Sequence, residues 1–561
     1  MAAICARFGR WSCIARALRG ERSVAVISVS NLTRGAAHFR ATGDWRDLQA
    51  STIIANELSA DPDRIVVRDR DRMLTVRDLD LQSRRLAAWM RAQGVGAGDV
   101  VSFQLPNWIE VHVIDLAAAL IGAISNPIVP IYRDAEVEFI LRESNSKLYF
   151  APTAFRSMRF DAMIDRISDR IPSLLRYVRV RDADGPCGFA HLLSGEHWLE
   201  APVWVDPDTP RLLMYTSGTT GRPKGVLHSI NTLSCEVENA ARYWGLERGD
   251  IMLMPSPLTH ITGYLYGVLF AELSGLTTIL MDRWDASLAV EIIEDCSVNA
   301  MVAATPFLQE LADAARARQT KLESLRLFAC GGAPVAPEIM REATDAFAQC
   351  TALRVYGCTE APTITLGAMV RGSATAICTE GFVVGHEVKL VDGDGNRIFG
   401  DAEGEILTRG PEVMLGYLRT EDNDAAFDSE GFFRTGDLGR FDAEGALTIT
   451  GRSKDIIIRG GENIAPKEIE DLLHDHPAVA EAAVIGMPHE RLGEAPCAFA
   501  VLQRGASTDA AQLQSYLDRA GLAKQKIPER FEFIDALPRT AAGKVQKFVL
   551  RDMFLIGEKN G

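Results

Sequence analysis

Short apolar runs alternate with segments of helical periodicity along the chain. Residues 65–67 and the mostly apolar residues 100–105 are expected to be strands. Thr75 and Asp78 have the spacing of a capping box at the start of an amphipathic helix, and residues 111–120 form another helical segment. This strand–helix rhythm predicts an α/β fold with a largely parallel sheet.

The most distinctive stretch is residues 216–225, Thr-Ser-Gly-Thr-Thr-Gly-Arg-Pro-Lys-Gly. A strand-like run at residues 212–215 precedes it, and apolar residues spaced four and three apart from Val226 to Trp244 predict a helix after it. A strand, a Gly-rich loop and a helix in this order present backbone N–H groups to a phosphate. The stretch is not a Walker loop, because a proline precedes its lysine and a glycine follows it.

A flexible surface loop is the alternative interpretation of this stretch. Such a loop would not be expected to concentrate hydroxyl groups, glycines and one lysine behind a strand. We therefore expect a phosphate-binding loop whose ligands are Thr216, Ser217, Gly218, Thr219, Thr220, Gly221 and Lys224.

The composition is that of an ordinary soluble globular protein. The chain has 561 residues, of which 47% are hydrophobic and 24% charged, and this length suits a large domain plus a smaller one. The formal net charge of −15 argues against non-specific binding to nucleic acid or anionic membranes. No stretch qualifies as a transmembrane helix, and the ten cysteines show no paired C-x-x-C spacing. A reducing, cytoplasmic location fits best.

The first forty residues differ from the rest, with seven arginines and one acidic residue, Glu21. This is the composition of a transit peptide, which would place the protein in the mitochondrial matrix. We favour a poorly ordered tail or an upstream start, because domain-like patterning begins only near Trp45. Residues 1–44 are therefore expected to be a tail.

Five more motifs follow the phosphate loop in order. A Gly-Gly pair at residues 331–332 ends a strand-like run, which lets a ligand approach the backbone closely. Val-Tyr-Gly-Cys-Thr-Glu occupies residues 355–360, and the two oxygens of Asp437 suit the paired hydroxyls of a ribose. The remaining two are Gly-Arg-Ser-Lys-Asp at residues 451–455 and Pro-Arg-Thr-Ala-Ala-Gly-Lys at residues 538–544.

Together these motifs resemble those of the adenylate-forming (AMP-binding) superfamily, over nearly the whole chain from about Trp45. The likeness is greatest to short- and medium-chain fatty-acyl-CoA synthetases and cyclohexanecarboxylate-CoA ligases. It rests on Pro-Leu-Thr-His-Ile-Thr-Gly at residues 257–263 and Arg-Gly-Gly-Glu-Asn-Ile at residues 459–464. The resemblance implies a large α/β domain of several subdomains, residues 45–451, and a small mobile α+β domain, residues 452–561.

The resemblance also implies roles for individual residues. Glu360 would hold Mg²⁺, Lys544 would be the catalytic lysine, and Lys454 would be the hinge between the domains. Contacts with ATP would come from Gly332, Ala333, Pro334, Tyr356, Gly357, Thr359, Asp437 and Arg452, the acyl pocket from His260 as its gate with Gly263, Cys330 and Gly331, and the CoA loop from Gly460, Gly461 and Glu462.

The implied reaction has two steps that use ATP, Mg²⁺ and CoA. A small-molecule carboxylate would attack the α-phosphate of ATP to give an acyl adenylate, and the small domain would then rotate so that CoA takes the acyl group. No acyl-pocket candidate carries a fixed charge, so we expect an apolar monocarboxylate, a short- or medium-chain fatty or alicyclic acid. A homodimer is compatible with the resemblance.

Three alternative functions remain open. The enzyme could load a separate carrier protein in place of CoA, or it could be a luciferase-like oxygenase with the same adenylation motifs. An inactive nucleotide-binding module is disfavoured, because Glu360, Asp437 and Lys544 are all present.

Three further patterns are interpreted as structural. Cys358 has no adjacent His–acid pair that would activate a nucleophile. The acidic residues at 392–403 have calcium-loop spacing, but an arginine stands where that loop needs glycine, so a β-hairpin is expected. Three histidines, His474, His476 and His489, are not spaced as metal ligands and are expected at the surface.

Overall fold

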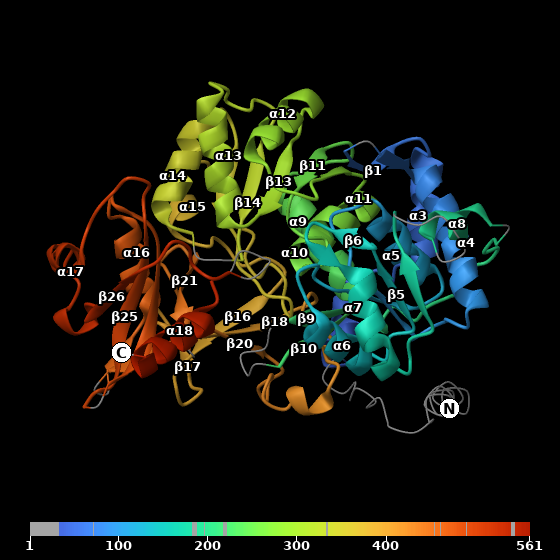
Figure 1. Ribbon diagram of the computed structural model, residues 1–561. Helices are drawn as coiled ribbons and strands as arrows, with labels where there is room; N and C mark the ends of the chain where they lie inside the picture. The colour runs from blue at the N-terminus through green and yellow to red at the C-terminus, as the bar shows by residue number, and fades with distance from the viewer. Residues whose placement is uncertain are drawn as a thin grey trace.

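The computed structural model describes residues 33–70, 72–181, 188–195, 197–216, 222–332, 335–453, 455–459, 462–489, 491–539 and 545–560. Two seven-stranded sheets and a five-stranded sheet form the larger part of the molecule, and a second five-stranded sheet lies in the C-terminal part (Figure 1). This is the α/β fold with a small C-terminal α+β domain that the sequence predicts.

The first sheet is parallel except for its last strand. Its order is β15 (Thr351–Arg354), β14 (Leu327–Cys330), β13 (Ala300–Ala303), β11 (Ile251–Met254), β12 (Thr277–Leu280), β1 (Ile65–Asp69) and the antiparallel β2 (Arg72–Thr75). On its outer side lie α12 (Ala286–Cys296), α13 (Thr305–Ala317) and α14 (Pro337–Ala346) (Figure 1). Parallel strands end at the same edge, so the loops after β14 and β15 emerge side by side.

The second sheet has a parallel centre and an antiparallel edge. Its order is β19 (Gly416–Tyr417), β10 (Lys224–Ser229), β9 (Pro210–Thr216), β4 (Ile124–Pro127), β3 (Val100–Phe103), β5 (Leu148–Ala151) and β8 (Arg176–Arg179). Strand β10 is antiparallel to both β9 and β19. The helices that follow its strands include α5 (Glu110–Leu120), α6 (Asp134–Glu143), α7 (Phe160–Ile167), α8 (Phe189–Ser194) and α9 (Ile230–Trp244).

The predicted strand–loop–helix at the phosphate loop is wrong in its last element. Residues 224–229 form β10, paired with β9 so that Lys224 faces Thr216, and α9 begins only at Ile230 behind a capping box made by Ser229 and Thr232. The apolar spacing from Val226 reads equally well as a buried strand, and pairing with β9 and β19 decides for the strand. The loop therefore connects two antiparallel strands, and no helix N-terminus follows it directly.

The third sheet is formed by strands that precede residue 454 in the sequence, and the fourth by strands that follow it. The third is antiparallel, in the order β17 (Arg397–Ile398), β16 (Glu387–Val391), β18 (Gly404–Arg409), β20 (Phe433–Phe441) and β21 (Leu447–Arg452). The fourth has the order β23 (Glu462–Ile464), β22 (Ile457–Arg459), β25 (Gly493–Leu502) and β24 (Val479–His489), with β26 (Arg530–Phe533) parallel to β25. Its helices are α16 (Pro466–His474), α17 (Ala510–Arg519) and α18 (Lys547–Asn560).

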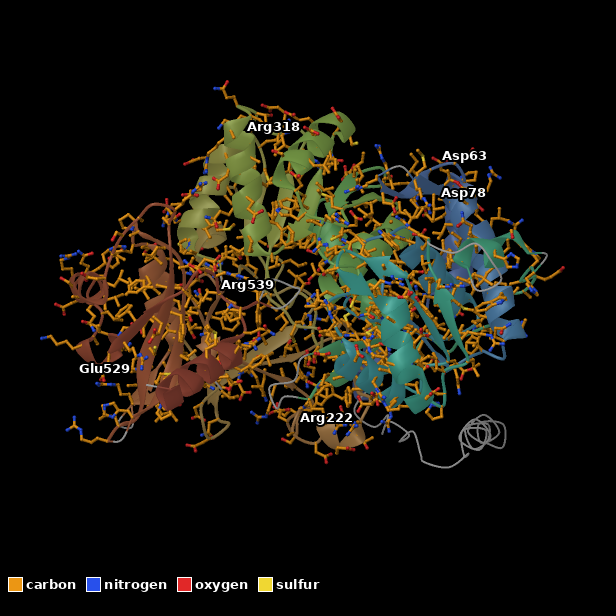
Figure 2. The ribbon with its side chains drawn as sticks, viewed as in Figure 1. Asp63, Asp78, Arg222, Arg318, Glu529 and Arg539 are labelled. Carbon is orange, nitrogen blue, oxygen red and sulfur yellow. The ribbon has the colours of Figure 1, made fainter. Side chains whose placement is uncertain are left out.

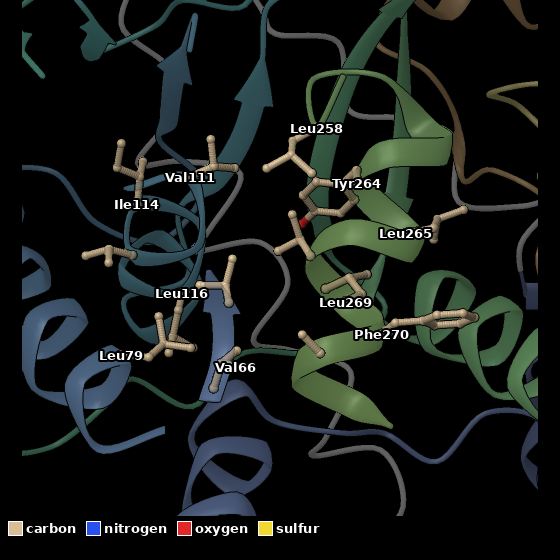
Figure 3. Close-up of a cluster of buried hydrophobic side chains, with 14 of the residues drawn as sticks. Val66, Leu79, Val111, Ile114, Leu116, Leu258, Tyr264, Leu265, Leu269 and Phe270 are labelled. Atoms are coloured by element: carbon tan, nitrogen blue, oxygen red, sulfur yellow. The ribbon is translucent and has the colours of Figure 1, made fainter. Parts of the chain in front are cut away.

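The largest apolar cluster joins the two seven-stranded sheets. Helix α5, whose side chains are all buried, packs between α4 (Val76–Ala92) and a helical segment made of α10 (Ile261–Gly263), the π-helix η3 (Tyr264–Leu269) and α11 (Phe270–Leu273). Figure 3 shows Val111 and Leu116 facing this segment, with Tyr264 and Leu269 on the other side. The core thereby fixes the segment that begins next to His260.

Local predictions elsewhere are confirmed. Thr75 and Asp78 form the capping box of α4, and residues 391–397 form the turn between β16 and β17. Two helices precede the first sheet, α2 (Thr33–Thr42) and α3 (Ala50–Ala60), and α2 lies inside the segment expected to be a tail. Residues 1–32 lie outside the described part of the chain. Over the residues that the structure describes, no helix has the length and apolar character needed to cross a membrane.

Candidate functional site

The candidate site begins at the carboxyl edge of the first sheet. Strand β14 runs directly into Gly331 and Gly332, and β15 runs into Val355 and Tyr356. A Cβ atom at Gly331 would lie 2.8 Å from the carbonyl oxygen of Val355, and Gly332 has a φ of +82°. Both positions therefore require glycine, which lets the two loops lie in contact.

The segment from Tyr356 to Thr365 folds back on itself as a tight loop. The backbone N–H of Tyr356 donates to Thr365 Oγ1 at 3.1 Å, and the N–H of Thr365 donates to the Tyr356 carbonyl at 3.1 Å. Inside the loop, a Cβ at Gly357 would lie only 2.2 Å from the Thr363 nitrogen. We call residues 356–365 the Glu360 loop, because Glu360 lies at its tip.

Two groups from other parts of the chain fix this tip. His228 Nε2 lies 2.7 Å from the carbonyl oxygen of Thr359, and the N–H of Met414 donates to the carbonyl oxygen of Glu360 at 2.8 Å. Burial lowers the pKa of His228 to about 4, so this imidazole is neutral and donates from Nε2. The Glu360 loop is thus held by its own backbone, by His228 of β10 and by Met414 just ahead of β19.

Asp437 joins this loop to the third sheet. Tyr356 Oη donates to Asp437 Oδ2 at 2.8 Å, and Arg452 Nε lies 2.9 Å from Asp437 Oδ1. Burial acts to lower the pKa of Arg452, but the nearby negative charges, of which Asp437 contributes most, together have the larger effect, and the pKa of Arg452 is raised. Burial also raises the pKa of Tyr356, so its hydroxyl stays a donor. Three residues predicted to contact ATP therefore lie together.

Glu360 and Lys224 lie on two sides of Tyr417. The Tyr417 hydroxyl donates to Glu360 Oε1 at 2.8 Å, and Lys224 Nζ lies 4.6 Å from the centre of the Tyr417 ring. Lys224 Nζ is also 3.5 Å from Asp422 Oδ1. Tyr417 could not be identified from the sequence, because an apolar run next to a glycine predicts only a short strand.

The Glu360 carboxylate fits the requirements of Mg²⁺. A magnesium ion takes one or two carboxylates and completes its shell with water and phosphate oxygens. Glu360 Oε1 accepts one hydrogen bond from Tyr417, and the ring of the same tyrosine lies 4.6 Å from Lys224 Nζ, so a carboxylate and a cation both border Tyr417. No cluster of three or more potential ligands occurs among the described residues, so no multi-carboxylate or histidine site is found there.

The acyl-pocket candidates lie in two segments, one around α10 after β11 and one at the end of β14. His260 is half-buried at the start of α10, and a Cβ at Gly263 would lie 2.0 Å from the Pro257 carbonyl oxygen, so only glycine fits. Cys330 is fully buried, and burial raises its pKa to about 12. Burial likewise raises the pKa of Cys358, so both thiols are uncharged and unreactive. This agrees with the interpretation of Cys358 as a structural residue and not a nucleophile.

Several predicted site residues lie outside the described part of the chain. They are Ser217, Gly218, Thr219, Thr220, Gly221, Ala333, Pro334, Lys454, Gly460, Gly461 and Lys544. Glu462 begins β23, and Thr216 ends β9 beside Lys224. Arg539, which precedes Lys544 in the same motif, forms an ion pair with Glu481 at 2.7 Å on the side of the C-terminal domain nearer the large domain (Figure 2).

The C-terminal histidines take part in local packing. The His476 ring lies edge-on to Tyr516 at 4.8 Å, and His489 Nδ1 accepts the N–H of Arg491. All three histidines are half-buried, which corrects their expected place at the surface.

Comparison with known proteins gives the same outline along the chain. The family profile described as "AMP-binding enzyme" matches residues 54–418, and the one described as "AMP-binding enzyme C-terminal domain" matches residues 468–544. A medium-chain fatty-acid–CoA ligase of Escherichia coli (strain K12) is 35% identical over 95% of this chain and 94% of its own length. A 2,3-dihydroxybenzoate-AMP ligase of Bacillus subtilis (strain 168) is 28% identical over 92% of this chain and 96% of its own.

A solved structure agrees with these relatives. ATP-bound MatB from Rhodopseudomonas palustris superposes with a TM-score of 0.82 and 28% identity, over 90% of this chain and 99% of that one.

Proposed function

Because the chain belongs to the AMP-binding enzyme family, we propose that it is an acyl-CoA synthetase for an apolar monocarboxylate. It would convert ATP and the acid to an acyl adenylate and pyrophosphate, and then transfer the acyl group to CoA with release of AMP. The observation that carries the proposal is the convergence of Tyr356, Asp437 and Arg452 with Glu360 at one edge of the first sheet. That the chain is an ATP-dependent ligase follows from the family itself.

The nucleotide would be oriented by the residues around Asp437. Each oxygen of this carboxylate accepts one protein hydrogen bond, from Arg452 or Tyr356, and keeps a lone pair for a ribose hydroxyl. The Tyr356 ring would lie against the adenine, and the Gly331–Gly332 backbone would approach its edge. These contacts position the α-phosphate without taking part in bond formation.

The first step joins two anions, so negative charge must be neutralised as the carboxylate oxygen bonds to the α-phosphorus and pyrophosphate leaves. Mg²⁺ bound at Glu360 would supply part of that positive charge. Lys224 would hold the outer phosphates, and Lys544 would bridge the acyl carboxylate and the α-phosphate.

The second step requires a different arrangement, because Lys544 would occupy the side from which the thiol arrives. We propose that residues 45–451 and 452–561 rotate about Lys454, which lies between β21 of the third sheet and β22 of the fourth. The rotation would bring Gly460, Gly461 and Glu462 to the site in place of Lys544.

The pocket candidates favour an apolar acid. Cys330 is buried and uncharged, and Gly263 and Gly331 contribute only backbone. A carboxylate or ammonium group at the far end of a substrate would find no opposite charge among these side chains. The Escherichia coli relative, a medium-chain fatty-acid–CoA ligase, supports the same substrate class.

Two arginines near the site support CoA over a carrier protein as the acyl acceptor. Arg156 and Arg283 lie 5.5 Å and 5.4 Å from the centre of the Phe155 ring, both are exposed, and neither pairs with a described carboxylate. A ring with two guanidinium groups beside it suits a nucleotide that carries additional phosphate. CoA has such a group, whereas the arm of a carrier protein lacks it.

The arginine pair is connected to the acyl-pocket loop. The Phe155 ring meets Trp108 edge-on at 5.8 Å, and the neighbouring Asn107 donates to the Ser256 carbonyl at 2.9 Å in the segment that leads to His260. If the nucleotide of CoA lay at Phe155, its long pantetheine arm would run past this segment to reach the acyl group.

A panel of carboxylates scored by ATP-dependent thioester formation tests the substrate class. We expect hexanoate, octanoate and cyclohexanecarboxylate to exceed amino acids and dicarboxylates, and the reverse order would refute the proposal. The acceptor is tested by comparing CoA with pantetheine. Arg156→Ala and Arg283→Ala should raise KM for CoA and leave KM for pantetheine unchanged, and Arg318→Ala, on the distant end of α13, is the matched control (Figure 2).

A further inference from the structure

A buried pair of carboxyl groups lies behind the Glu360 loop. Glu236 on α9 and Glu412 ahead of β19 are each 1% exposed, and their carboxyl groups are hydrogen-bonded to each other. Burial raises the pKa of both Glu236 and Glu412 above the ordinary value of a carboxyl group. At least one of the two therefore holds a proton, which lets them share a hydrogen bond.

Glu412 is held by polar neighbours on α9 and just ahead of β16. Asn239 Nδ2 donates to its Oε1 at 2.5 Å, and His386 Nε2 lies 3.0 Å from its Oε2. His386 is held in turn by Thr408 Oγ1, which lies 3.0 Å from its Nδ1. Two residues after Glu412, the N–H of Met414 donates to the carbonyl oxygen of Glu360.

Glu236 reaches the same loop by a second route. The hydroxyl of Tyr266, a buried residue of η3, donates to Glu236 Oε1 and also contacts Thr363 Oγ1. Because the single phenolic proton is given to Glu236, Thr363 must donate its own proton to the tyrosine oxygen. A chain of hydrogen bonds therefore runs from α9 through the π-helix to the Glu360 loop.

Thr363 occupies an unfavourable backbone conformation. Its φ is +42°, in the left-handed region that β-branched residues avoid, and its nitrogen packs directly under Gly357. A threonine is kept in this conformation only when its surroundings impose it. Here the hydroxyl bond to Tyr266 does so, and a shift of Thr363 would move the loop that carries Glu360.

Burying this many polar groups costs free energy that only their hydrogen bonds can offset. Two carboxyl groups, a phenol and a threonine hydroxyl lie in a region where apolar side chains could fill the same space. A fully connected polar network holds one arrangement, whereas apolar packing tolerates several.

We infer that Glu236, acting through Tyr266 and Thr363, is a positioning residue that fixes the Glu360 carboxylate for Mg²⁺-bound ATP. The inference rests on the metal role of Glu360 in the proposed function. It adds residues from α9 and η3 that touch neither ATP nor the acyl group, and it predicts that their loss weakens the contribution of the metal.

Calorimetric titration with ATP, in the presence of Mg²⁺ and again with EDTA, separates the metal contribution from nucleotide binding and needs no acyl substrate. Tyr266→Phe and Thr363→Val each remove one hydroxyl and keep the shape of the side chain. Each should weaken binding of Mg²⁺–ATP about five- to tenfold, the effect of one hydrogen bond, and leave metal-free ATP binding unchanged. Thr363→Ser, which keeps the hydroxyl, should bind like the wild type.

A matched control removes a buried hydroxyl elsewhere. Tyr149 is fully buried and donates to Gln104 Oε1, far along the chain from the Glu360 loop. Tyr149→Phe should lower thermal stability as Tyr266→Phe does, without changing the affinity for Mg²⁺–ATP. Glu236→Gln, whose amide oxygen still accepts from Tyr266, should retain most of the affinity that Glu236→Leu loses.

Two results would overturn the inference, and they are distinguishable. If Glu360→Gln abolishes the gain from Mg²⁺ while Tyr266→Phe and Thr363→Val keep it within about twofold, the metal role stands and the network is only structural. If Glu360→Gln itself keeps the full gain, the metal role of Glu360 is wrong, and the inference falls with it.

Discussion

Replacing Asp437 by asparagine tests how the site holds the nucleotide. Asp437 is 6% exposed, and its two oxygens are engaged by Arg452 and Tyr356 at 2.9 Å and 2.8 Å. Asparagine keeps the size of the side chain but presents one oxygen and one amide group. One ribose hydroxyl would lose its acceptor, and either Arg452 or Tyr356 would face a donor.

The expected loss follows from the charge of the acceptor. A hydrogen bond to a charged group contributes about 1.5–3 kcal/mol. Loss of one such bond to ribose and weakening of the other should cost about 3 kcal/mol of binding, or about a hundredfold increase in KM for ATP. The Arg452 side chain is 39% exposed, so solvent screens its pair with Asp437 and the loss of folding stability should stay near 1 kcal/mol.

Acid-dependent exchange of pyrophosphate into ATP measures KM for ATP in the first half-reaction. Tyr356→Phe is the matched control, because it keeps the ring and the Asp437 charge and removes only one donor. It should change KM for ATP by less than about fivefold. A KM for Asp437→Asn within about threefold of the wild type, with the fold intact, would refute the ribose role of this carboxylate.

Three further predictions concern the metal, the moving domain and pH. Glu360→Gln should lower the rate of adenylation at least about a hundredfold, and near-normal pyrophosphate release at saturating Mg²⁺ would contradict the assignment. Lys544→Ala should abolish acyl-AMP formation yet still transfer the acyl group from supplied acyl-AMP to CoA. Lys454→Pro fixes φ near the hinge, so it should spare adenylation and abolish thioester formation. Loss of the same step in both variants would refute the alternation of the two domain orientations. Burial lowers the pKa of His112 from 6.5 to about 3, so below pH 6.5 the unfolded chain binds a proton that the folded chain does not, and stability falls as pH drops. In urea unfolding, the free energy of unfolding of His112→Leu, relative to that of the wild type, should therefore rise by about 2 kcal/mol as the pH falls from 6.5 to 5. If this difference in the free energy of unfolding stays constant over the same range, His112 is protonated in the fold.

The sequence by itself determined the chemistry of the site and the local elements. The residue types at Asp437, Glu360 and Lys224 limit what each can bind, and this information needs no structure. The capping box of α4 and the turn after β16 are likewise determined by neighbours three or four residues apart. Such short-range patterns are decided by backbone geometry close to each residue.

Contacts between distant segments were decided only by the tertiary structure. Residues 224–229 became a strand because β9 and β19 were available on both sides, although their apolar spacing also suits a helix. The Tyr417 bond to Glu360 and the Tyr266 bond to Thr363 join residues 57 and 97 positions apart. Periodicity reports which face of an element is buried, and it carries no information about which distant polar group that face will meet. The hydrogen bonds that support the Glu360 loop therefore became visible only once the chain was folded.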